Sequence, residues 1–354
     1  INSTNVQNLV KMVVFSPSIP LKTRLFLLLL TLVIPGFKGG AQYTEVINSN
    51  RPGQSVSAYA VGTGVIQLES GFSYGQSGES NDNNDTNLFG VDLGLRYGLL
   101  LENLELHYEG TYLNQTISDL ATGVEENLSG FGMNRLGAKY LVFDPFKNPE
   151  RNKPNLLSWR ANNKFRLRNL VPAVSVYAGA NFNFGDNPFF PNEPSFSPRA
   201  LVATQSRLTP RSVLVTNLAY DRIGTDFPEL SYLISYSHAF RNPRWSIFLE
   251  HQGIDSDRYS DMLLRSGLAY LVHEDFQADV SFTYSFNDPG GIFATGGISY
   301  RLDYHKDKAI EDQKSRIKRN SMKKKGSEVG ISRKEKRQKR KKDRKAAATL
   351  DFDN

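Results

Sequence analysis

The chain has 354 residues, no cysteine and a formal net charge of +7. The absence of cysteine excludes disulfide bonds, thiol nucleophiles and cysteine-ligated metals. The charge is uneven, because His305–Asn354 holds 19 of the 43 Lys and Arg residues but only 8 of the 36 Asp and Glu residues, so that the remainder is net acidic.

The N-terminal region has the parts of a secretory signal in the expected order. A basic stretch (Lys22 and Arg24) precedes an apolar run (Leu25–Ile34) and a group of small residues that ends at Ala41. The apolar run is too short to span a bilayer as a helix, and a buried core helix is the less favoured alternative. We expect Met12 to be the initiator and cleavage to follow Ala41, so that residues 1–41 are removed and Gln42 begins the mature chain.

Two segments between Leu88 and Tyr112 alternate between apolar and polar residues. Successive side chains of a strand point to opposite faces, so this period of two predicts strands with one apolar and one polar face. Similar segments of roughly ten residues recur along the chain, which is typical of an outer-membrane β-barrel. The pattern predicts twelve strands: Val65–Tyr74, Asn87–Leu99, Leu104–Ile117, Leu128–Phe143, Val171–Phe184, Pro198–Arg207, Ser212–Ile223, Leu230–Phe240, Trp245–Gln252, Tyr259–Leu271, Phe276–Phe286 and Ile292–Tyr304.

Short and long connections alternate between these strands, as short periplasmic turns and long extracellular loops do in outer-membrane barrels. The long polar loops are expected at residues 76–86, 118–127, 185–197 and 253–258. One periplasmic connection, residues 144–170, is long and contains Trp159 and the basic residues Arg160, Lys164, Arg166 and Arg168, so a short interfacial helix is possible there. The sequence therefore predicts an all-β fold, a closed antiparallel transmembrane barrel over residues 65–304. Both of its ends face the periplasm.

Four motifs resemble a known family: Asn50–Ser55, Gly64–Gly71, Leu95–Gly98 and Glu102–Leu106. The chain is similar there to the "MetA-pathway of phenol degradation" family of proposed outer-membrane transporters. The resemblance spans roughly Asn50 to Tyr304 and excludes the basic tail. It implies a barrel transporter without fixing a substrate.

Many charged residues share the polar face of the predicted strands. They either line a conduction path and select solutes by charge, or pair with one another as a plug, because a twelve-stranded barrel lies between filled small barrels and open porins. The candidate lumen residues are Glu69, Asp92, Arg96, Glu105, His107, Glu109, Arg135, Lys139, Asp221, Glu250, Arg265, Asp279 and Arg301.

An N-terminal segment, residues 42–64, precedes the barrel and contains Arg51 and Pro52. Proline favours an extended conformation in the residue before it. We predict that Asn48–Ala60 folds back inside the barrel or its periplasmic mouth, and that Arg51 pairs with a lumen carboxylate such as Glu69 or Glu105.

The sequence offers few signs of catalysis. Glu105, His107 and Glu109 share one strand face, but no second cluster of metal ligands accompanies them. A lipase would need a serine beside a histidine on the lipid-facing side, and His238, the candidate there, has no partner serine that the sequence identifies. We therefore expect no catalytic residue, no bound metal and no cofactor.

The basic tail, residues 305–354, has too few apolar residues to form a core, so we expect it to be solvated in the periplasm, disordered or helical. An alternative is that it binds anionic lipid, the cell wall or an acidic partner, whereas export argues against nucleic acid. We expect a monomeric channel for passive or facilitated passage of small molecules, hydrophobic or aromatic ones by the resemblance alone. The alternative function is a non-conducting structural barrel whose tail recruits a periplasmic partner.

Overall fold

The structure is a computed structural model, and it describes residues 46–79, 84–147, 156–158, 165–185, 187–286 and 291–305, together with residues 337, 338 and 341. The predicted signal sequence, its cleavage point after Ala41, residues 159–164 and nearly all of the basic tail lie outside these ranges. The chain divides into two units, Ile1–Tyr304 and His305–Asn354. No helix in the described ranges is both long enough and apolar enough to cross a membrane.

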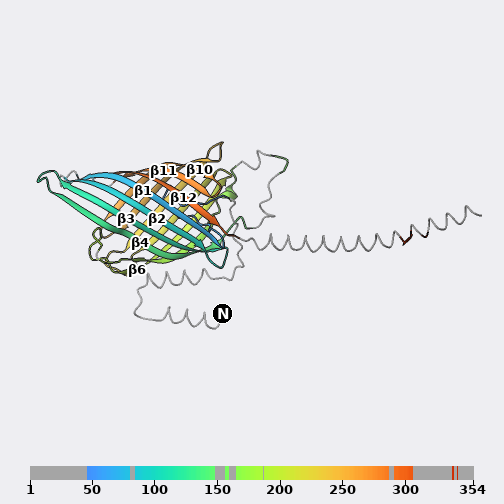
Figure 1. Cartoon of the computed structure of the whole chain (residues 1–354), viewed down its shortest axis with the longest axis horizontal. Helices are drawn as coiled ribbons and strands as arrows, with labels where there is room; N and C mark the ends of the chain where they lie inside the picture. Colours follow the sequence, from blue (N-terminus) through green and yellow to red (C-terminus); the bar gives the residue numbers. More distant parts are fainter. Residues whose placement is uncertain are drawn as a thin grey trace, which may run out of the picture. The chain divides into compact units, whose positions relative to one another are not determined.

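Twelve strands make up the first unit (Figure 1), and their bounds lie close to the predicted ones. They are β1 (Val65–Glu79), β2 (Asn84–Gly98), β3 (Leu104–Asp119), β4 (Glu125–Phe143), β5 (Ala173–Phe182), β6 (Phe196–Thr209), β7 (Ser212–Asp221), β8 (Glu229–Ala239), β9 (Trp245–Ser256), β10 (Ser260–His273), β11 (Phe276–Ser285) and β12 (Gly291–Asp303).

The strands form one closed antiparallel sheet in which each pairs with its sequence neighbours and β12 returns to β1. At Gly71 of β1, for example, the backbone lies opposite Asp92 of β2 on one side and Gly297 of β12 on the other. A closed sheet has no free edge, which is the condition for a β structure to cross a bilayer. The predicted fold class, a closed barrel of twelve antiparallel strands, is confirmed.

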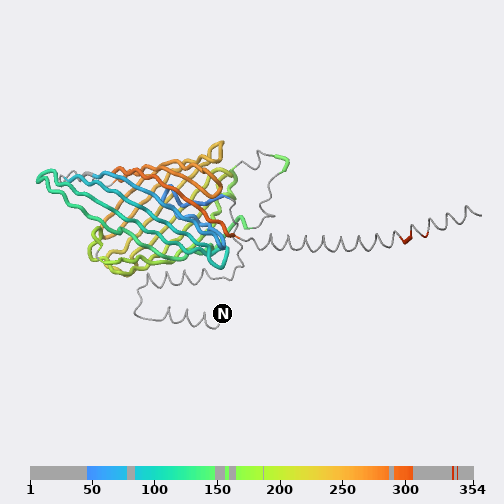
Figure 2. Tube along the Cα trace, in the orientation of Figure 1, coloured from blue at the N-terminus to red at the C-terminus, as the bar shows by residue number. Residues whose placement is uncertain are grey.

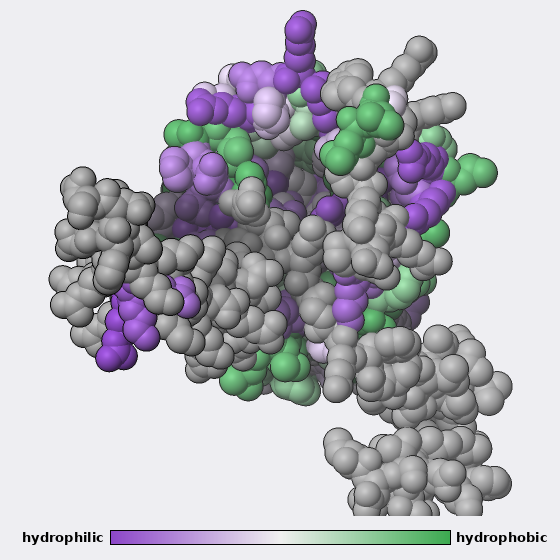
Figure 3. Space-filling model, turned by 90° about the vertical axis from the view of Figure 1, so that its right-hand side faces the viewer, coloured by the Kyte–Doolittle hydropathy of each residue, from purple (hydrophilic) through white to green (hydrophobic). Residues whose placement is uncertain are grey.

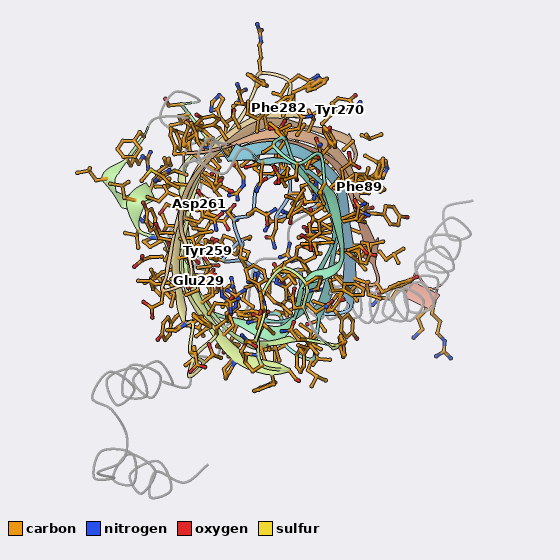
Figure 4. The ribbon with its side chains drawn as sticks, turned by 90° about the vertical axis from the view of Figure 1, so that its left-hand side faces the viewer. Phe89, Glu229, Tyr259, Asp261, Tyr270 and Phe282 are labelled. Atoms are coloured by element: carbon orange, nitrogen blue, oxygen red, sulfur yellow. The ribbon has the colours of Figure 1, made fainter. Side chains whose placement is uncertain are left out.

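The outer face of the barrel is apolar. On β8, Leu230, Tyr232, Ile234 and Tyr236 are each more than 40% exposed, while the intervening Leu233 is buried. Figure 4 shows the same arrangement elsewhere, with labelled aromatic side chains projecting from the outer wall. Exposed apolar side chains all around a closed sheet match the hydrocarbon of a membrane.

The hairpins β1–β2 and β3–β4 are longer than predicted, and they project beyond the other strands in Figure 1. Much of the loops predicted at residues 76–86 and 118–127 is strand. Polar pairs on the outer face explain the difference: Gln76 Nε2 donates to Asn87 Oδ1 at 3.1 Å, and Thr116 Oγ1 donates to Asn127 Oδ1 at 2.6 Å. Such cross-strand pairs stabilise a ladder in water, beyond the apolar band.

The long connection between β4 and β5 contains one 3-10 helix, η1 (Leu167–Leu170), within its described residues, where a short interfacial helix was predicted. Asn169 Nδ2 donates to Leu208 O at 2.8 Å, and Ser206 Oγ donates to Leu170 O at 3.0 Å. These bonds hold η1 against the end of β6. As a result β5 begins at Ala173, later than predicted.

Candidate functional site

The N-terminal segment, described over residues 46–64, crosses the inside of the barrel, and its blue trace lies within the ring of strands in Figure 2. It begins beside the β10–β11 turn, where Ile47 N donates to Glu274 O at 2.8 Å. Further along, Val56 bonds to Asn217 of β7 through both backbone groups, at 2.7 and 2.9 Å. Most of its described hydrogen bonds go to inward-facing side chains and not to strand backbone. The segment therefore occupies the lumen as a plug.

Arg51 lies where β1, β11 and β12 meet, and it pairs with Asp279 of β11. Its Nη2 is 3.1 Å from Asp279 Oδ1 and its Nε is 3.4 Å from Oδ2. Asp279 is one of the predicted lumen carboxylates, but the two given as examples, Glu69 and Glu105, are not partners of Arg51. The guanidinium instead fills the space over two glycines, Gly71 and Gly297, where a Cβ on either residue would overlap it.

Arg96, Glu105 and Lys139 form a fully buried ion cluster beside the N-terminal segment. Glu105 Oε1 is 2.8 Å from Arg96 Nε and 3.2 Å from Lys139 Nζ. Glu69 adds a second carboxylate, 3.6 Å from Arg96 Nη1. Two cations and two carboxylates thus balance one another inside the barrel, which explains why Glu69 and Glu105 are not free to pair with Arg51.

This ion cluster also holds the N-terminal segment by its backbone. Arg96 Nη1 donates to Asn48 O at 2.6 Å, and Lys139 Nζ donates to Ser57 O at 2.8 Å. The amide of Val61 in turn donates to the cluster's shared carboxylate at 3.0 Å. Because hydrogen bonds to charged groups are stronger than neutral ones, the cluster anchors the plug at three places.

On the opposite wall one predicted residue, Glu250, binds the segment, and a second, Arg265, supports Glu250. Glu250 of β9 is fully buried and accepts from the amide of Gln54 and from Arg265 Nη1, both at 3.0 Å. Gly53 lies so close that a Cβ there would meet the Glu250 carboxylate. A side chain at position 53 would therefore displace the Glu250 carboxylate from the amide of Gln54.

A second ion cluster centres on Asp221 and spans from β4 to β7. Arg135 Nη2 lies 2.7 Å from Asp221 Oδ2, and Arg199 contacts the same oxygen. Asn181 Nδ2 donates to Asp221 Oδ1 at 2.6 Å, and Arg135 reaches Glu109 at 3.9 Å. These contacts tie neighbouring and non-neighbouring strands together across the lumen wall.

The possible metal or acid–base set Glu105, His107 and Glu109 does not converge. His107 Nε2 lies 3.4 Å from Glu109 Oε1, and the His107 ring packs edge-on against Tyr177. Glu105 instead pairs with the cations described above. Across the described ranges there is no group of three or more His, Cys, Asp or Glu residues placed to hold a metal ion.

Two predicted lumen residues lie apart from these clusters. Asp92 Oδ1 accepts a hydrogen bond from Thr111 Oγ1 at 2.7 Å. Arg301 pairs with Asp275 of the β10–β11 turn at 2.6 Å, so it belongs to the end of the barrel and not to the middle of the lumen.

Several uncharged side chains that bind the segment were not predicted, because candidates were chosen among charged and titratable residues only. Gln67, Gln205 and Asn217 are buried and bond to the N-terminal segment. They lie at the alternating positions of their strands that face the lumen, so the alternation in the sequence could have identified them. Loop residues such as Glu193 and Arg222 gave no comparable signal, since only the folded chain brings them together.

A cavity of about 230 Å³ lies inside the barrel near the loop ends of β7, β8 and β9. Arg222 stands at its edge, paired with Glu193 and, at 2.6 Å, with Glu229. Tyr259 donates its hydroxyl to Glu229 at 2.9 Å, and both side chains point into the barrel in Figure 4. The remaining lining residues are Gly132, Met133, Asn134, Arg135, Asn181, Asn183, Phe190, Arg199, Ser231, Gln252 and Ile254.

The two loop residues of this cavity keep their protons at neutral pH. Burial lowers the pKa of Arg222, but the hydrogen bond and charge of Glu193, with the charge of Glu229, outweigh it and leave the pKa above its ordinary value. Burial, followed by the charge of Glu229, raises the pKa of Tyr259. The cavity therefore presents a permanent cation and a neutral hydroxyl.

Part of the inner wall at the loop end of the barrel is apolar, whereas a polar inner face was predicted. Phe293 of β12 lies over Gly75, and Leu113 of β3 lies over Gly132 beside Phe189 of the β5–β6 loop. The register of β3 and β4 shifts at this point by a β-bulge, which re-aims the side chains of β4 above it. At the loop end the charged lining is thus interrupted by apolar groups on the side of β1, β3, β4 and β12, while it continues on the side of β7 and β8 with Arg222 and Glu229.

His238 does have a serine partner, contrary to the sequence analysis. Ser212 Oγ lies 2.9 Å from His238 Nδ1, and Tyr236 donates to the same Oγ at 3.1 Å. Ser212 starts the strand beside β8, at a distance in sequence that hid the pairing. Among the described contacts no carboxylate orients the other ring nitrogen, which a catalytic serine–histidine pair needs.

Residues 49–302 match the family described as "Putative MetA-pathway of phenol degradation". The chain belongs to this family. The match covers the crossing segment and all twelve strands, so the resemblance of the sequence motifs is confirmed. The family match and the closed twelve-stranded barrel thus fall on the same residues. No curated protein sequence matches the chain.

Several solved outer-membrane barrels are similar in fold. An outer membrane channel from Pseudomonas putida F1 has 13% identity and a TM-score of 0.44, with 72% of this chain and 100% of that one covered. The NanC porin has 8% identity and a TM-score of 0.40, with 65% and 100% covered. The CymD monoaromatic hydrocarbon channel has 10% identity and a TM-score of 0.38, with 69% and 90% covered.

Proposed function

We propose that the chain lets small hydrophobic or aromatic molecules cross the outer membrane, by passive or facilitated diffusion through its lumen. The supporting observation is the apolar inner wall at the loop end, next to a cavity that combines Phe190 and Met133 with arginine, glutamate and tyrosine groups. A hydroxylated aromatic ring needs both kinds of contact. The family's association with phenol degradation points to the same class of solute.

While the N-terminal segment lies in the lumen, this path is closed. Passage requires its displacement, and the bonds that hold it are mainly to side chains, so it can leave without opening the strand ladders. In this proposal the predicted lumen charges have two successive roles. They hold the plug while the barrel is closed and line the path once the plug has moved.

The alternative function is that of a non-conducting structural barrel. The hydrogen bonds that hold the plug to the wall favour it. The segment is bonded to Arg96, Lys139, Glu250 and Asp279, all of them buried. In this second function the lumen stays filled, and the basic tail recruits a periplasmic partner.

We place the chain in the outer membrane as a monomer, exported through the signal that ends at Ala41, with both ends in the periplasm. Outer-membrane lipid and a small solute are its proposed partners, and no catalytic residue or cofactor is assigned. The tail is proposed to be solvated or to bind an anionic partner through its excess of Lys and Arg. A pull-down with the tail that finds no salt-sensitive partner would contradict binding of an anionic partner by the tail.

Planar-bilayer conductance of refolded Gln42–Asn354 separates the two functions. A channel is expected to give discrete steps, with and without His305–Asn354, because the crossing segment alone closes the lumen. Steps in the tail-less form only would make the tail the plug. Silence in both forms, and also after release of the crossing segment, would favour the structural barrel.

The substitution Arg51→Ala is expected to raise the fraction of time that the channel is open by about tenfold to a hundredfold. It removes two hydrogen bonds to a carboxylate, worth about 1.5–3 kcal/mol. Single-channel recordings measure the change, and Arg258→Ala, on an extracellular loop, serves as a control. Unchanged opening together with unchanged stability would show that Arg51 does not hold the plug.

A further inference from the structure

Three exposed arginines lie on two adjacent short turns of the barrel. Arg211 belongs to the β6–β7 turn, and Arg241 and Arg244 belong to the β8–β9 turn. The two turns are joined directly, because Ala239 N donates to Arg211 O at 2.8 Å. The three guanidinium groups therefore lie along one stretch of the rim, which we call the basic rim.

The charge of the basic rim is not compensated locally. In the part of the chain that the structure describes, none of the three arginines forms an ion pair, and residues 208–211 and 240–244 include no Asp or Glu. Helix η1, which contains Arg168 and directly follows Arg166, is bonded to Leu208 near the end of β6. The positive charge thus continues along the rim toward β5.

Apolar and aromatic groups of the outer wall lie directly beside the basic rim. Trp245 follows Arg244 and packs against Tyr270 with ring centroids 4.6 Å apart, and Phe240 is 41% exposed. Trp and Tyr at this position mark the membrane–water boundary. Figure 3 views this end of the barrel, where hydrophilic groups project next to hydrophobic groups of the outer wall.

The hydrogen-bonded group Ser212, Tyr236 and His238 lies on the same outer face, next to Arg211. Polar side chains on a lipid-facing wall are unfavourable in hydrocarbon, so their place is at the level of the lipid headgroups and ester bonds. Along the outer wall, from the rim toward the middle of the membrane, arginine side chains come first. Hydroxyl and imidazole groups follow, and then aromatic and aliphatic side chains. A phospholipid presents phosphate, ester and acyl chain in the same order.

We propose that the basic rim binds an anionic phospholipid of the periplasmic leaflet. Arg211, Arg241 and Arg244 hold the phosphate, for which a planar guanidinium offers paired donors. The acyl chains lie along Trp245 and the neighbouring apolar side chains. The short turns of outer-membrane barrels face the periplasm, which selects the phospholipid leaflet over lipopolysaccharide. This binding does not depend on whether the lumen conducts.

The test is a lipid titration of the full chain in detergent, followed by native mass spectrometry. Phosphatidylglycerol, phosphatidylcholine and lipid A are the probes. The variant R211Q/R241Q/R244Q is expected to bind phosphatidylglycerol on the order of a hundredfold more weakly, about fivefold for each arginine. The variant R211K/R241K/R244K, which keeps the charge, is expected to retain most of the binding.

The variant L120E/A121E/V124E, on the exposed β3–β4 loop at the other end of the barrel, lowers the net charge equally and is expected to bind like the wild type. Heat-dependent gel migration checks that every variant forms a barrel. Equal binding of phosphatidylcholine, tighter binding of lipid A, wild-type binding by the glutamine variant, or an equal loss in the β3–β4 loop variant would each overturn the proposal.

Discussion

Replacing Glu105 by Gln is expected to destabilise the barrel by about 3–5 kcal/mol, the usual cost of removing one partner of a buried ion pair. The carboxylate is fully buried and is shared by Arg96 and Lys139, which are also fully buried. A neutral amide leaves the lumen with two cations and only the more distant Glu69 to balance them. The loss should therefore exceed that of any single surface change.

Denaturant unfolding in lipid vesicles, followed by tryptophan fluorescence, measures this effect. Glu125→Gln is the matched control, because that glutamate is exposed at the loop end of β4, and surface changes usually stay within about 0.5 kcal/mol. A loss for Glu105→Gln no larger than the control's would mean that the cluster does not hold the lumen together.

Joining the plug to the wall by a disulfide is expected to abolish conductance reversibly. A Cβ built at Gly53 points at the Glu250 side chain, 3.2 Å from its Cδ, so in the pair Gly53→Cys and Glu250→Cys a small movement of the segment toward β9 brings the two thiols into bonding distance. The chain has no cysteine of its own, which leaves one possible pairing. The oxidised variant should remain closed, and a reductant should restore opening.

Each single variant, with and without reductant, is the control, because Glu250→Cys alone also removes the partner of Arg265. If the oxidised double variant conducts as well as the reduced one, the solute path does not require the N-terminal segment to move. The proposal for the resting state would then fail, while the barrel's identity would stand.

Alternation in the sequence was enough to predict the barrel. It placed all twelve strands, since a strand exposed to lipid on one side must repeat its polarity every second residue. It failed where strands leave the membrane: around Gln76 and Asn87 the outer face is polar, so the strand continues although the pattern has ended.

The sequence did not predict which lumen side chains pair with one another. Arg135 and Asp221 come from β4 and β7, and their contact depends on the curvature of the closed sheet and the stagger of its strands. The same holds for Arg51, whose partner was decided by the space over Gly71 and Gly297. Strand parity predicts that such residues face inward, but it does not say which of them meet.

The position of the N-terminal segment also constrains how the barrel assembles. Arg51 and Asp279 are 228 residues apart, and the segment additionally bonds to Gln277 and Ser281 of β11. The first residues of the barrel unit thus meet their partners on almost the last strand to be synthesised. Contacts of such long range slow folding. These contacts can form only once β11 is in place, so the plug cannot be completed before the last strands of the barrel.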